Sequence, residues 1–600
     1  MSSVHATAAA LLLTLCALVT AYSDDPPPGP IRRDVGPWPS APRVGEQVPD
    51  FTLTPISGEP RSLSNATGPR GLVIAIRDVY CPLSAKTGPK IAALEDDYRK
   101  RGWRFLYLNV SSHNPPDEMG EEAKRLGLDG AYVHEPKSPL AHFLDTRTTT
   151  EVFVLDTRRT LRYRGAIDDQ HGIGFSRTKP RTNYLVEALD AIGRGEPVSI
   201  AATTAPGCEL RVPTVATKRP DATYHNRISR ILERACVECH REGAGSPPPL
   251  ETYEQVVGTR AMVRQVVSDR TMPPWFAKEG SGPWHNPHPL SEKDRRAIIE
   301  WIEGGAPEGD ASDAPLPRTW SKGWSLGQPD VVVGKSRSES VPAEGVLDYR
   351  VHFLECPNDQ ARWVDAIEIR PSHPAVVHHV LVFVEEPRRA GESREAYRAR
   401  AALGLDGFFA SLVPGQGATE FARGMAKRLP RNAWLKVQVH YQPNGRAVDS
   451  TIEIGFHFAK GAPKHRLTTA SARNTSFEIP AGAKSHQVRA SYTFAEQSRL
   501  VAFMPHMHLR GRAFRFELER PGEERTTVLD IPSYDFNWQL RYALVEPIAV
   551  PRGSRLHATA WYDNSAENPA NPDPSLRVRF GEQTADEMMI GYFDYFTEAE

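Results

Sequence analysis

The sequence lacks an excess of charge of either sign. Its 600 residues include 73 lysines and arginines against 74 aspartates and glutamates. This balance gives no electrostatic reason to expect binding to nucleic acid or to an anionic membrane surface, so no nucleic-acid partner is predicted. Hydrophobic residues make up 40% of the chain, which argues against a disordered protein. A chain of this length exceeds a single hydrophobic core, and several globular domains are expected.

Long apolar runs are missing after residue 21, so the sequence predicts no membrane span. The run Ala8–Ala21 is too short to cross a bilayer, and Val19-Thr-Ala21 fits a cleavage site made of small residues. We therefore interpret residues 1–21 as a secretory signal peptide, although no lysine or arginine precedes the apolar run. This interpretation predicts a periplasmic or secreted protein.

Cysteine is scarce, with six in the chain, yet two of the six form a motif. Cys236, Cys239 and His240 follow the pattern Cys-x-x-Cys-His, which is the attachment signal for a c-type haem. The two thiols would bond the haem vinyl groups, and the histidine would ligate the iron. A structural zinc site would need a second pair of ligands, and no later cysteine lies nearby. The motif therefore predicts one covalently bound haem c.

The residues around this motif predict a small all-α domain at 222–312. Met272, on a proline-rich turn, is the predicted distal iron ligand, because Met/His ligation suits electron transfer. Trp275 is expected to pack on the macrocycle. The helical pattern 290–303 begins after an N-cap, Ser291, and ends at two glycines. The domain resembles a mono-haem cytochrome c.

Residues 46–200 alternate strand and helix patterns, which predicts an α/β domain. The region resembles the thioredoxin-like redoxins. By that resemblance, Cys81 lies where their active cysteine opens a helix, a position that stabilises a thiolate. Ser84 replaces the second cysteine of a dithiol enzyme, and Thr150 replaces the cis-proline. Neither Cys-x-x-Cys exchange nor ordinary peroxidase chemistry is supported.

Two interpretations of this domain stay open. In the first, Cys81 pairs with Cys208, which lies just past the domain, as a redox or structural disulfide. In the second, the domain is a scaffold without catalysis of its own. Cys356 is interpreted as a buried free thiol. At least one of these three thiols is unpaired within the chain.

Histidines in strand patterns predict a metal site in the last part of the chain. His506 and His508 lie two apart in an apolar strand pattern, so their side chains point to the same side. His378 and His379 lie in the β-branched run 375–383, and adjacent residues of a regular strand point to opposite faces. These two histidines can therefore share an ion only where the strand is bulged or ends.

Two further residues complete the pattern. His440 lies in the strand pattern 435–441, and Met588 precedes the aromatic strand pattern 590–596. Imidazoles combined with a thioether suit copper, because thioether sulfur is a poor ligand for zinc, calcium or magnesium. Four ordered segments resemble the copper type II ascorbate-dependent monooxygenases, namely Val377–Phe383, Gln438–Tyr441, His506–Gly511 and Asp586–Met588.

This resemblance implies two copper ions and a fold of two packed antiparallel β-sandwiches of jelly-roll type, with the metals facing a cleft between them. One copper would transfer electrons and the other would bind dioxygen. The implied ligands are His378, His379 and His440 for the first copper, and His506, His508 and Met588 for the second.

The same resemblance implies an oxidoreductase that hydroxylates a C–H bond with dioxygen. The electrons would come from an external donor, either an ascorbate-like reductant or a periplasmic redox protein, and we expect the fused haem to relay them. Met504 and Ile590 replace an arginine and an asparagine of the peptide-hydroxylating relatives, while their tyrosine is kept as Tyr592, which we place with the catalytic residues. The substrate, a small molecule or a peptide, is expected to be apolar or uncharged. The alternatives are an electron-transfer or copper-binding protein without hydroxylase activity, and a thiol redox protein that uses Cys81.

The predicted architecture is multidomain. In order along the chain it comprises the signal peptide 1–21, a linker 22–45, the redoxin domain 46–200, a linker 201–221, the cytochrome c domain 222–312, a linker 313–329, and the two copper sandwiches 330–465 and 466–600.

Overall fold

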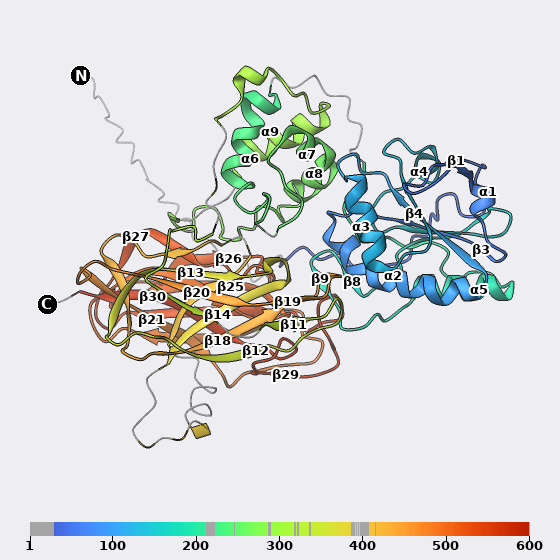
Figure 1. Cartoon of the computed structure of the whole chain (residues 1–600). Helices are drawn as coiled ribbons and strands as arrows, with labels where there is room; N and C mark the ends of the chain where they lie inside the picture. The colour runs from blue at the N-terminus through green and yellow to red at the C-terminus, as the bar shows by residue number, and fades with distance from the viewer. Residues whose placement is uncertain are drawn as a thin grey trace, which may run out of the picture.

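The structure is a computed structural model of the chain. It shows an α/β domain, a small helical domain and a large β region (Figure 1). The predicted signal peptide, residues 1–21, lies outside the described residues. No helix among those residues is long and apolar enough to cross a membrane. The structure describes residues 29–211, 222–244, 246–285, 290–316, 320, 323–334, 338–385, 391, 393, 395–396, 407–414 and 416–598.

The α/β domain is built on a mixed sheet with the order β5-β4-β3-β6-β7. Strands β3, β4 and β5 are parallel, while β6 and β7 are antiparallel to their neighbours. Residues of β3 alternate between two cores, one covered by α2, α3 and α5 and the other by α1 and α4. The bounds are α1 Leu63–Ala66, β3 Gly71–Ile76, α2 Pro82–Lys100, β4 Trp103–Asn109, α3 Pro116–Leu126, β5 Ala131–His134, α4 Pro139–Phe143, β6 Val152–Leu155, β7 Leu161–Gly165 and α5 Tyr184–Arg194.

Short strand pairs flank this sheet. They are β1 Thr52–Leu53 with β2 Arg61–Ser62, and β8 His171–Gly172 with β9 Phe175–Ser176.

The described parts of two expected linkers, 22–45 and 201–221, are ordered on this domain. Arg33 forms a bridge with Ile173, and Pro37 forms one with Thr203. Residues 29–45 and 201–211 are thus held by backbone pairing rather than left as free connectors, because the pairing satisfies their polar groups.

The helical domain surrounds its own core, which includes Ile298 and Trp301. Helix α9 begins as predicted, since Oγ of Ser291 accepts a hydrogen bond from the backbone N–H of Asp294 at 3.1 Å. The bounds are η1 Tyr224–Ile228, α6 Ser229–Ala235, α7 Tyr253–Gly258, α8 Arg260–Ser268, α9 Glu292–Glu303 and η2 Ala311–Asp313.

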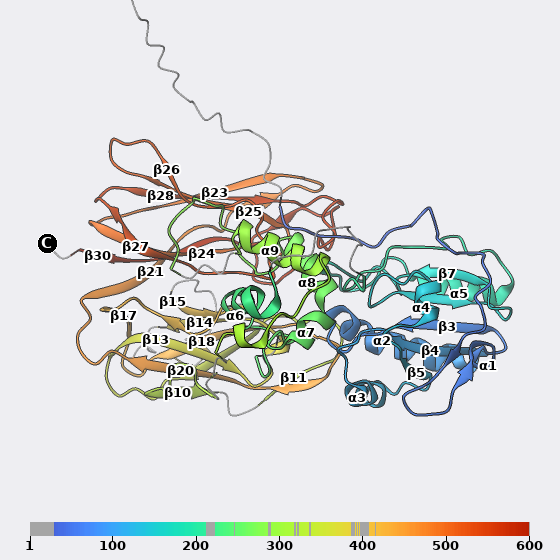
Figure 2. The same cartoon turned by 90° about the horizontal axis from the view of Figure 1, so that it is seen from above.

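The β region consists of two sandwiches, and Figure 2 shows one layered on the other. The N-terminal sandwich packs β10-β20-β13-β17 on the inner sheet β12-β18-β14-β15. The C-terminal sandwich packs β21-β30-β24-β27 on β23-β28-β25-β26. A parallel pairing of β17 with β21 joins one sheet of each sandwich into a single continuous sheet.

The strand and 3-10 helix bounds of this region follow. They are β10 Val331–Gly334, β11 Glu339–Val341, β12 Arg350–Glu355, β13 Arg362–Pro371, η3 Pro374–Val376, β14 Val377–Glu385, β15 Phe408–Leu412, β16 Thr419–Glu420, β17 Met425–Leu429, β18 Trp434–Tyr441, β19 Val448–Ser450, β20 Ile452–Phe458, β21 His465–Asn474, β22 Glu478–Ile479, β23 His486–Thr493, β24 Ser498–His506, β25 Gly511–Glu519, β26 Thr526–Ile531, β27 Tyr542–Val550, β28 Arg555–Tyr562, β29 Val578–Arg579 and β30 Met589–Thr597.

The inner sheet is buried on both faces. On β14, Val380 and Val382 point into the core of the N-terminal sandwich, while Leu381 and Phe383 meet the C-terminal sandwich. This double burial explains the continuous apolar run of β14 in the sequence. The apolar layer between the sandwiches consists of Leu381, Phe383, Phe408, Met504, Met588, Ile590 and Tyr592.

A buried ion network also crosses between the two sandwiches. Asp594 on β30 lies 2.9 Å from the Nζ atom of Lys427 on β17 and 2.9 Å from a guanidinium nitrogen of Arg541. Thr469 on β21 donates a hydrogen bond to the same carboxylate at 2.6 Å. The network therefore ties the strands on both sides of the β17–β21 pairing.

Candidate metal centre

Three imidazoles converge near the end of the inner sheet. His378 and His379 lie at the start of β14, and His440 lies near the end of β18 beside it. The ladder between the two strands shifts register between Val377 and His379, so His378 is the extra residue of a β-bulge. This is the irregularity that two adjacent histidines need in order to face one ion.

The geometry of this cluster fits a metal ion. Nδ1 of His378 lies 3.0 Å from Nδ1 of His379 and 3.2 Å from Nδ1 of His440. Two nitrogens bound to one tetrahedral ion at about 2.0–2.1 Å stand roughly 3.3 Å apart, close to these distances. Burial lowers the pKa of all three rings, that of His378 to about 4, so their lone pairs are available to a cation at neutral pH.

A second pair of imidazoles lies at the end of β24. Nδ1 of His506 is 2.6 Å from Oε1 of Gln539, and Nδ1 of His508 is 3.1 Å from the backbone oxygen of Asp586. Because both Nδ1 atoms donate to oxygen, Nε2 is left as the metal-binding atom of each ring. Nε2 of His508 is buried and has no hydrogen-bond partner among the described residues. Burial lowers the pKa of both rings, that of His506 to about 4.

The register of β24 and β30 places Met588 on the same face as these rings. His506 pairs with Ile590, so the next positions that share this face are His508 and Met588. The Met588 side chain is buried in the layer between the sandwiches, as is that of Tyr592. Two imidazoles and a thioether therefore belong to one end of one strand pair.

The two histidine clusters contact each other directly. The ring centroids of His379 and His506 lie 6.4 Å apart. The ring of Tyr349 lies 5.4 Å from that of His379 and 6.0 Å from that of His508. A cleft was expected between the two sites, and among the described residues the rings of Tyr349, His379, His506 and His508 pack against one another there.

Glu587 is a supporting residue that the sequence analysis missed. Its carboxylate accepts backbone hydrogen bonds from His508 at 2.9 Å and Arg510 at 2.6 Å. Burial raises the pKa of this carboxyl to about 7, against the charge of Arg510. Because Glu587 directly precedes Met588, these hydrogen bonds hold the turn after β24 next to the start of β30. The sequence signal for this supporting role is the motif Asp586-Glu587-Met588.

Two other supporting residues carry no local sequence signal. Gln539 fixes the tautomer of His506 from a loop before β27, and Tyr349 reaches both clusters from the segment before β12. The backbone N–H of Tyr349 donates to the side-chain oxygen of Gln583 at 3.3 Å, which connects the two sandwiches at this point. Such contacts between distant segments become visible only in the folded chain.

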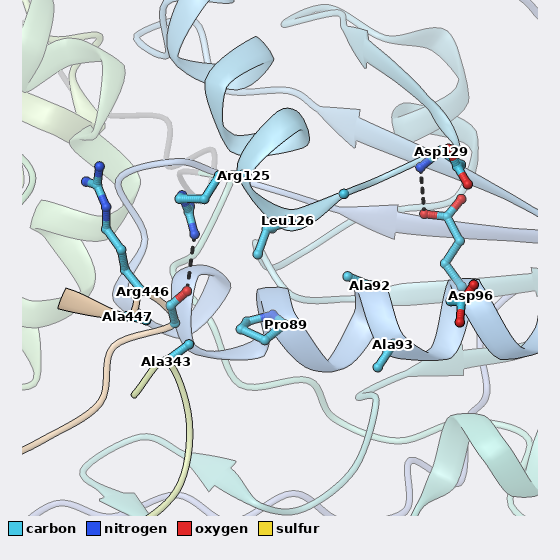
Figure 3. A pocket seen from close by; sticks show the side chains of 13 residues that line it. Pro89, Ala92, Ala93, Asp96, Arg125, Leu126, Asp129, Ala343, Arg446 and Ala447 are labelled. Atoms are coloured by element: carbon cyan, nitrogen blue, oxygen red, sulfur yellow. Dashed lines mark hydrogen bonds between the residues drawn. The ribbon is translucent and has the colours of Figure 1, made fainter. Parts of the chain in front are cut away.

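The α/β domain packs against the turn that follows His440 in the chain. The backbone oxygen of Gly445 accepts a hydrogen bond from Nη1 of Arg125 at 3.1 Å. A Cβ atom at Gly445 would lie 1.9 Å from the backbone oxygen of Ala85, so only glycine fits this contact. A cavity of about 580 Å³ lies beside it, between α2, α3 and residues 445–447 (Figure 3).

The helical domain holds the residues expected to bind haem. Cys236 and Cys239 are free thiols in the turn after α6, and Nδ1 of His240 is 3.1 Å from the backbone oxygen of Pro248. That hydrogen bond leaves Nε2 of His240 as the atom for a metal, so the three residues fit the predicted attachment. Met272 follows α8 and is half-buried.

Trp275 packs on the C-terminal sandwich. Its ring lies 4.9 Å from that of Tyr542 and 6.5 Å from that of Trp284, on the core of that sandwich. The segment around Trp284 pairs with β27, since Trp284 forms a bridge with Leu544. That Trp275 also packs on a macrocycle stays a prediction.

The α/β domain brings Cys81 and Cys208 together, with their Sγ atoms 3.1 Å apart. Both are free thiols, and so is the buried Cys356.

Two protein families match parts of the chain. Residues 467–600 match the C-terminal domain of the copper type II ascorbate-dependent monooxygenases, and residues 44–164 match the AhpC/TSA family. The chain contains a copper monooxygenase C-terminal domain. The matched residues include His506, His508 and Met588, whereas the three-histidine cluster lies outside them. The first match supports copper, an oxidoreductase role, dioxygen and a reductant, and the second supports a thioredoxin-like domain.

Solved structures with similarity to parts of the chain include three bacterial proteins. An uncharacterised conserved protein from Geobacillus kaustophilus is 24% identical, with a TM-score of 0.27, over 31% of this chain and 100% of its own. A putative thiol:disulfide interchange protein DsbE from Chlorobium tepidum is 15% identical, with a TM-score of 0.19, over 20% and 84%. Peroxidoxin BcpB from Mycobacterium tuberculosis is 19% identical, with a TM-score of 0.20, over 26% and 97%. No curated protein matches the chain.

Proposed function

We propose that the protein is a copper-dependent monooxygenase that hydroxylates a C–H bond with dioxygen. The observation that carries the proposal is the contact of two buried imidazole clusters, one from each sandwich, at an interface that also holds a thioether. The copper-binding residues would be His378, His379 and His440 on one side, and His506, His508 and Met588 on the other. When bound, the two copper ions would supply electron transfer and oxygen activation.

The protein side chains prepare the site in two ways. Gln539 and the backbone oxygen of Asp586 hold the Nδ1–H groups of His506 and His508, so both rings are oriented before a ligand arrives. Burial keeps the imidazoles neutral and excludes water, which strengthens electrostatic interactions inside the site.

The surroundings favour an apolar or uncharged substrate. Met504 and Ile590 belong to the apolar layer between the sandwiches, and neither offers a charge to a carboxylate. Tyr592 stacks on Phe408 in the same layer, with ring centroids 4.7 Å apart, and we place it at the substrate side of the site. A screen of small molecules and peptides for a gained hydroxyl group would identify the substrate.

The helical domain would serve as the electron relay. Cys236 and Cys239 would attach a haem c and His240 and Met272 would hold its iron, and a Met/His pair suits electron transfer. The segment around Trp284, which follows α8 of this domain, is docked on the C-terminal sandwich. The domain is therefore held at a high local concentration beside the proposed copper sites. An ascorbate-like reductant or a redox protein would supply the electrons. The apolar run at 8–21 and the haem motif favour the periplasm or the exterior as the location.

Metal analysis and oxygen uptake test the proposal together. The purified protein should contain two copper ions and one iron per chain, and its reduced form should consume dioxygen while a screened substrate gains a hydroxyl group. His506→Ala should abolish oxygen uptake and leave iron unchanged. Bound copper and active electron transfer without any hydroxylated product would instead establish an electron-transfer or copper-binding protein, the alternative function.

A further inference from the structure

The α/β domain contains a pair of thiols that the copper chemistry does not use. Cys81 is the N-cap of α2, and its Sγ atom accepts a hydrogen bond from the backbone N–H of Ser84 at 3.4 Å. Oγ1 of Thr149 donates to the same sulfur at 2.9 Å, and the thiol of Cys208 lies 3.1 Å away. Three donors therefore converge on one sulfur atom.

Cys208 is delivered to this position by backbone pairing. The backbone N–H of Thr149 donates to the oxygen of Cys208 at 3.2 Å, and the N–H of Cys208 donates to Oγ1 of Thr149 at 3.0 Å. After Cys208, Glu209 forms a bridge with Thr148 and the N–H of Leu210 donates to the oxygen of Arg147, and before it Oγ1 of Thr148 donates to the oxygen of Ala205. The segment 205–211 is thus fixed along the loop that precedes β6.

The pKa values of the two thiols are shifted in opposite directions, which favours Cys81 as the thiolate and Cys208 as the thiol. Burial and the charge of Asp78 would raise the pKa of the Cys81 thiol, but the hydrogen bonds from Cys208, Thr149 and Ser84 outweigh them and lower the pKa to about 7. The Cys81 contact is the largest cause that raises the pKa of Cys208 well above its ordinary value. Near neutral pH a substantial fraction of the molecules therefore carries a Cys81 thiolate that accepts a hydrogen bond from the Cys208 thiol.

A cavity lies beside the thiol pair. It has a volume of about 130 Å³, and its lining includes Cys81, Cys208 and residues 258–262 of the helical domain. This volume holds roughly four waters, which is enough for a small reagent. The N–H of Glu209 donates to Oε1 of Gln265 in α8 at 3.1 Å, so the segment that carries Cys208 contacts both domains.

We propose that Cys81 and Cys208 are a redox-active dithiol that a low-molecular-weight disulfide converts into an intrachain disulfide. The second sulfur comes from the interdomain segment rather than from a Cys-x-x-Cys motif, whose place is taken by Ser84. The oxidised form locks residues 205–211, and through Glu209 the neighbouring helical domain, to the α/β fold. The reduced form holds the same contacts by hydrogen bonds alone.

The reaction balances without any other reactant. The Cys81 thiolate attacks the disulfide RS–SR, and the S–S bond of the reagent breaks to release RS⁻ and leave a mixed disulfide. The Cys208 thiol then attacks Sγ of Cys81, loses its proton and displaces RSH. Two protein sulfurs are oxidised by two electrons and one reagent disulfide is reduced to two thiol equivalents. The Sγ atoms need to approach by only about 1 Å to reach bonding distance.

The full-length protein can be equilibrated in mixtures of 2-mercaptoethanol and its disulfide, alkylated, and mapped by peptide mass. We expect Cys81 and Cys208 to lose alkylation together in one two-electron transition. In Cys208→Ser, a mixed disulfide should accumulate at Cys81 instead. Cys356→Ser is the matched control and should leave the transition unchanged. Independent oxidation of the two sulfurs, or full alkylation in the pure disulfide, would overturn the proposal.

A pH profile separates a redox role from a merely structural one. In the reduced protein, the rate of Cys81 alkylation by iodoacetamide should rise with pH and reach half its maximum near pH 7. Cys208→Ala removes the strongest contact that favours the thiolate, so the midpoint should move to higher pH. An unchanged midpoint in this variant would contradict the assigned pairing.

Discussion

The two histidine clusters are assembled by opposite uses of the same β-strand geometry. In the cluster of the C-terminal sandwich, His506 ends β24 and His508 follows two residues later, and this spacing brings their ring centroids to 5.3 Å from each other. In the cluster of the N-terminal sandwich, a bulge turns His378 out of the regular order so that it joins His379 and His440. A regular strand therefore makes a site that also accepts a thioether, while a bulged strand gathers three Nδ1 atoms.

The clusters also differ in what lies behind them. The α/β domain contacts the turn at Gly445 that follows His440 in the chain. The sandwich that carries His506 contacts the helical domain, because Trp284 forms a bridge with Leu544. The division is not complete, because the α/β domain also reaches the C-terminal sandwich, where Asn537 donates a hydrogen bond to the backbone oxygen of Gly174 at 3.4 Å. Substitutions in one cluster at a time test whether the two clusters differ in this way.

Removing one ligand from either cluster should have the largest effect. His379→Ala and His508→Ala should each lower the copper content from two ions to about one per chain and reduce oxygen uptake to background. Each variant removes one of the three proposed ligands of its cluster. Elemental analysis gives the copper content directly. His465→Ala is the control, since that ring stacks on Phe596 away from both clusters, and should keep both ions.

Loss of the buried carboxylate between the sandwiches should come next. Asp594→Asn leaves the charges of Lys427 and Arg541 without their partner, which should cost about 3–5 kcal/mol of unfolding free energy. Denaturant titration of the variant and the unchanged protein measures this difference.

The pH dependence of that difference follows from the direction of the pKa shift. Burial opposes ionisation of Asp594, but the charges of Lys427 and Arg541 outweigh it and hold the pKa well below 3.8. The stabilisation is therefore complete above the unfolded-state pKa of 3.8 and is lost as the pH falls toward the folded-state pKa. The gap between the two proteins should be constant near pH 6 and narrow below pH 3.8. A gap that widens in acid would contradict the assignment.

Two adjacent methionines provide the sharpest matched pair. Met588→Ala should weaken Cu(I) binding at the C-terminal cluster by at least about 10–100-fold, a loss typical even of indirect supports. Met589 points into the sandwich core instead, so Met589→Ala should destabilise the fold by about 2–5 kcal/mol without selective loss of copper affinity. Competition with a Cu(I) chelator distinguishes the two. Equal copper affinities in both variants would remove Met588 from the ligand set.

The smallest effect is expected at the support of the three-histidine cluster. Gly445→Val forces a side chain against the backbone oxygen of Ala85 and should cost about 1–3 kcal/mol of docking between the α/β domain and the N-terminal sandwich. Hydrogen exchange of α2 reports this docking. Gly461→Val is the control, because no atom lies within 4 Å of its Cβ position. Faster exchange in the control as well would indicate a general loss of stability.

Sequence reasoning was most successful where a local pattern determines structure. The helix after Cys81, the N-cap at Ser291 and the aromatic strand β30 follow from capping signals and periodicity, and the structure contains them. The need for a bulge at His378 also followed from strand geometry alone. These features depend on residues that are close together in the chain.

The remaining features depend on segments that are distant in the chain. Gln539 and Tyr349 contact the histidines from separate loops, and no spacing rule connects them. The ordered pairing of residues 29–45 went against an expectation based on composition, and the docking of Trp275 on the C-terminal sandwich was not foreseen. Proline- and threonine-rich segments are compatible with linkers, and only tertiary partners show that these are held in place.

The parallel pairing of β17 with β21 constrains how reactants can arrive. A ladder of backbone hydrogen bonds joins one sheet of the N-terminal sandwich to the sheet that carries His506, and moving the two sandwiches apart would break it. The spacing of the two clusters would therefore be set when the chain folds. In the proposed enzyme, dioxygen and substrate would have to reach the clusters without separation of the sandwiches, past rings such as those of Tyr349 and Phe536 that contact the histidines.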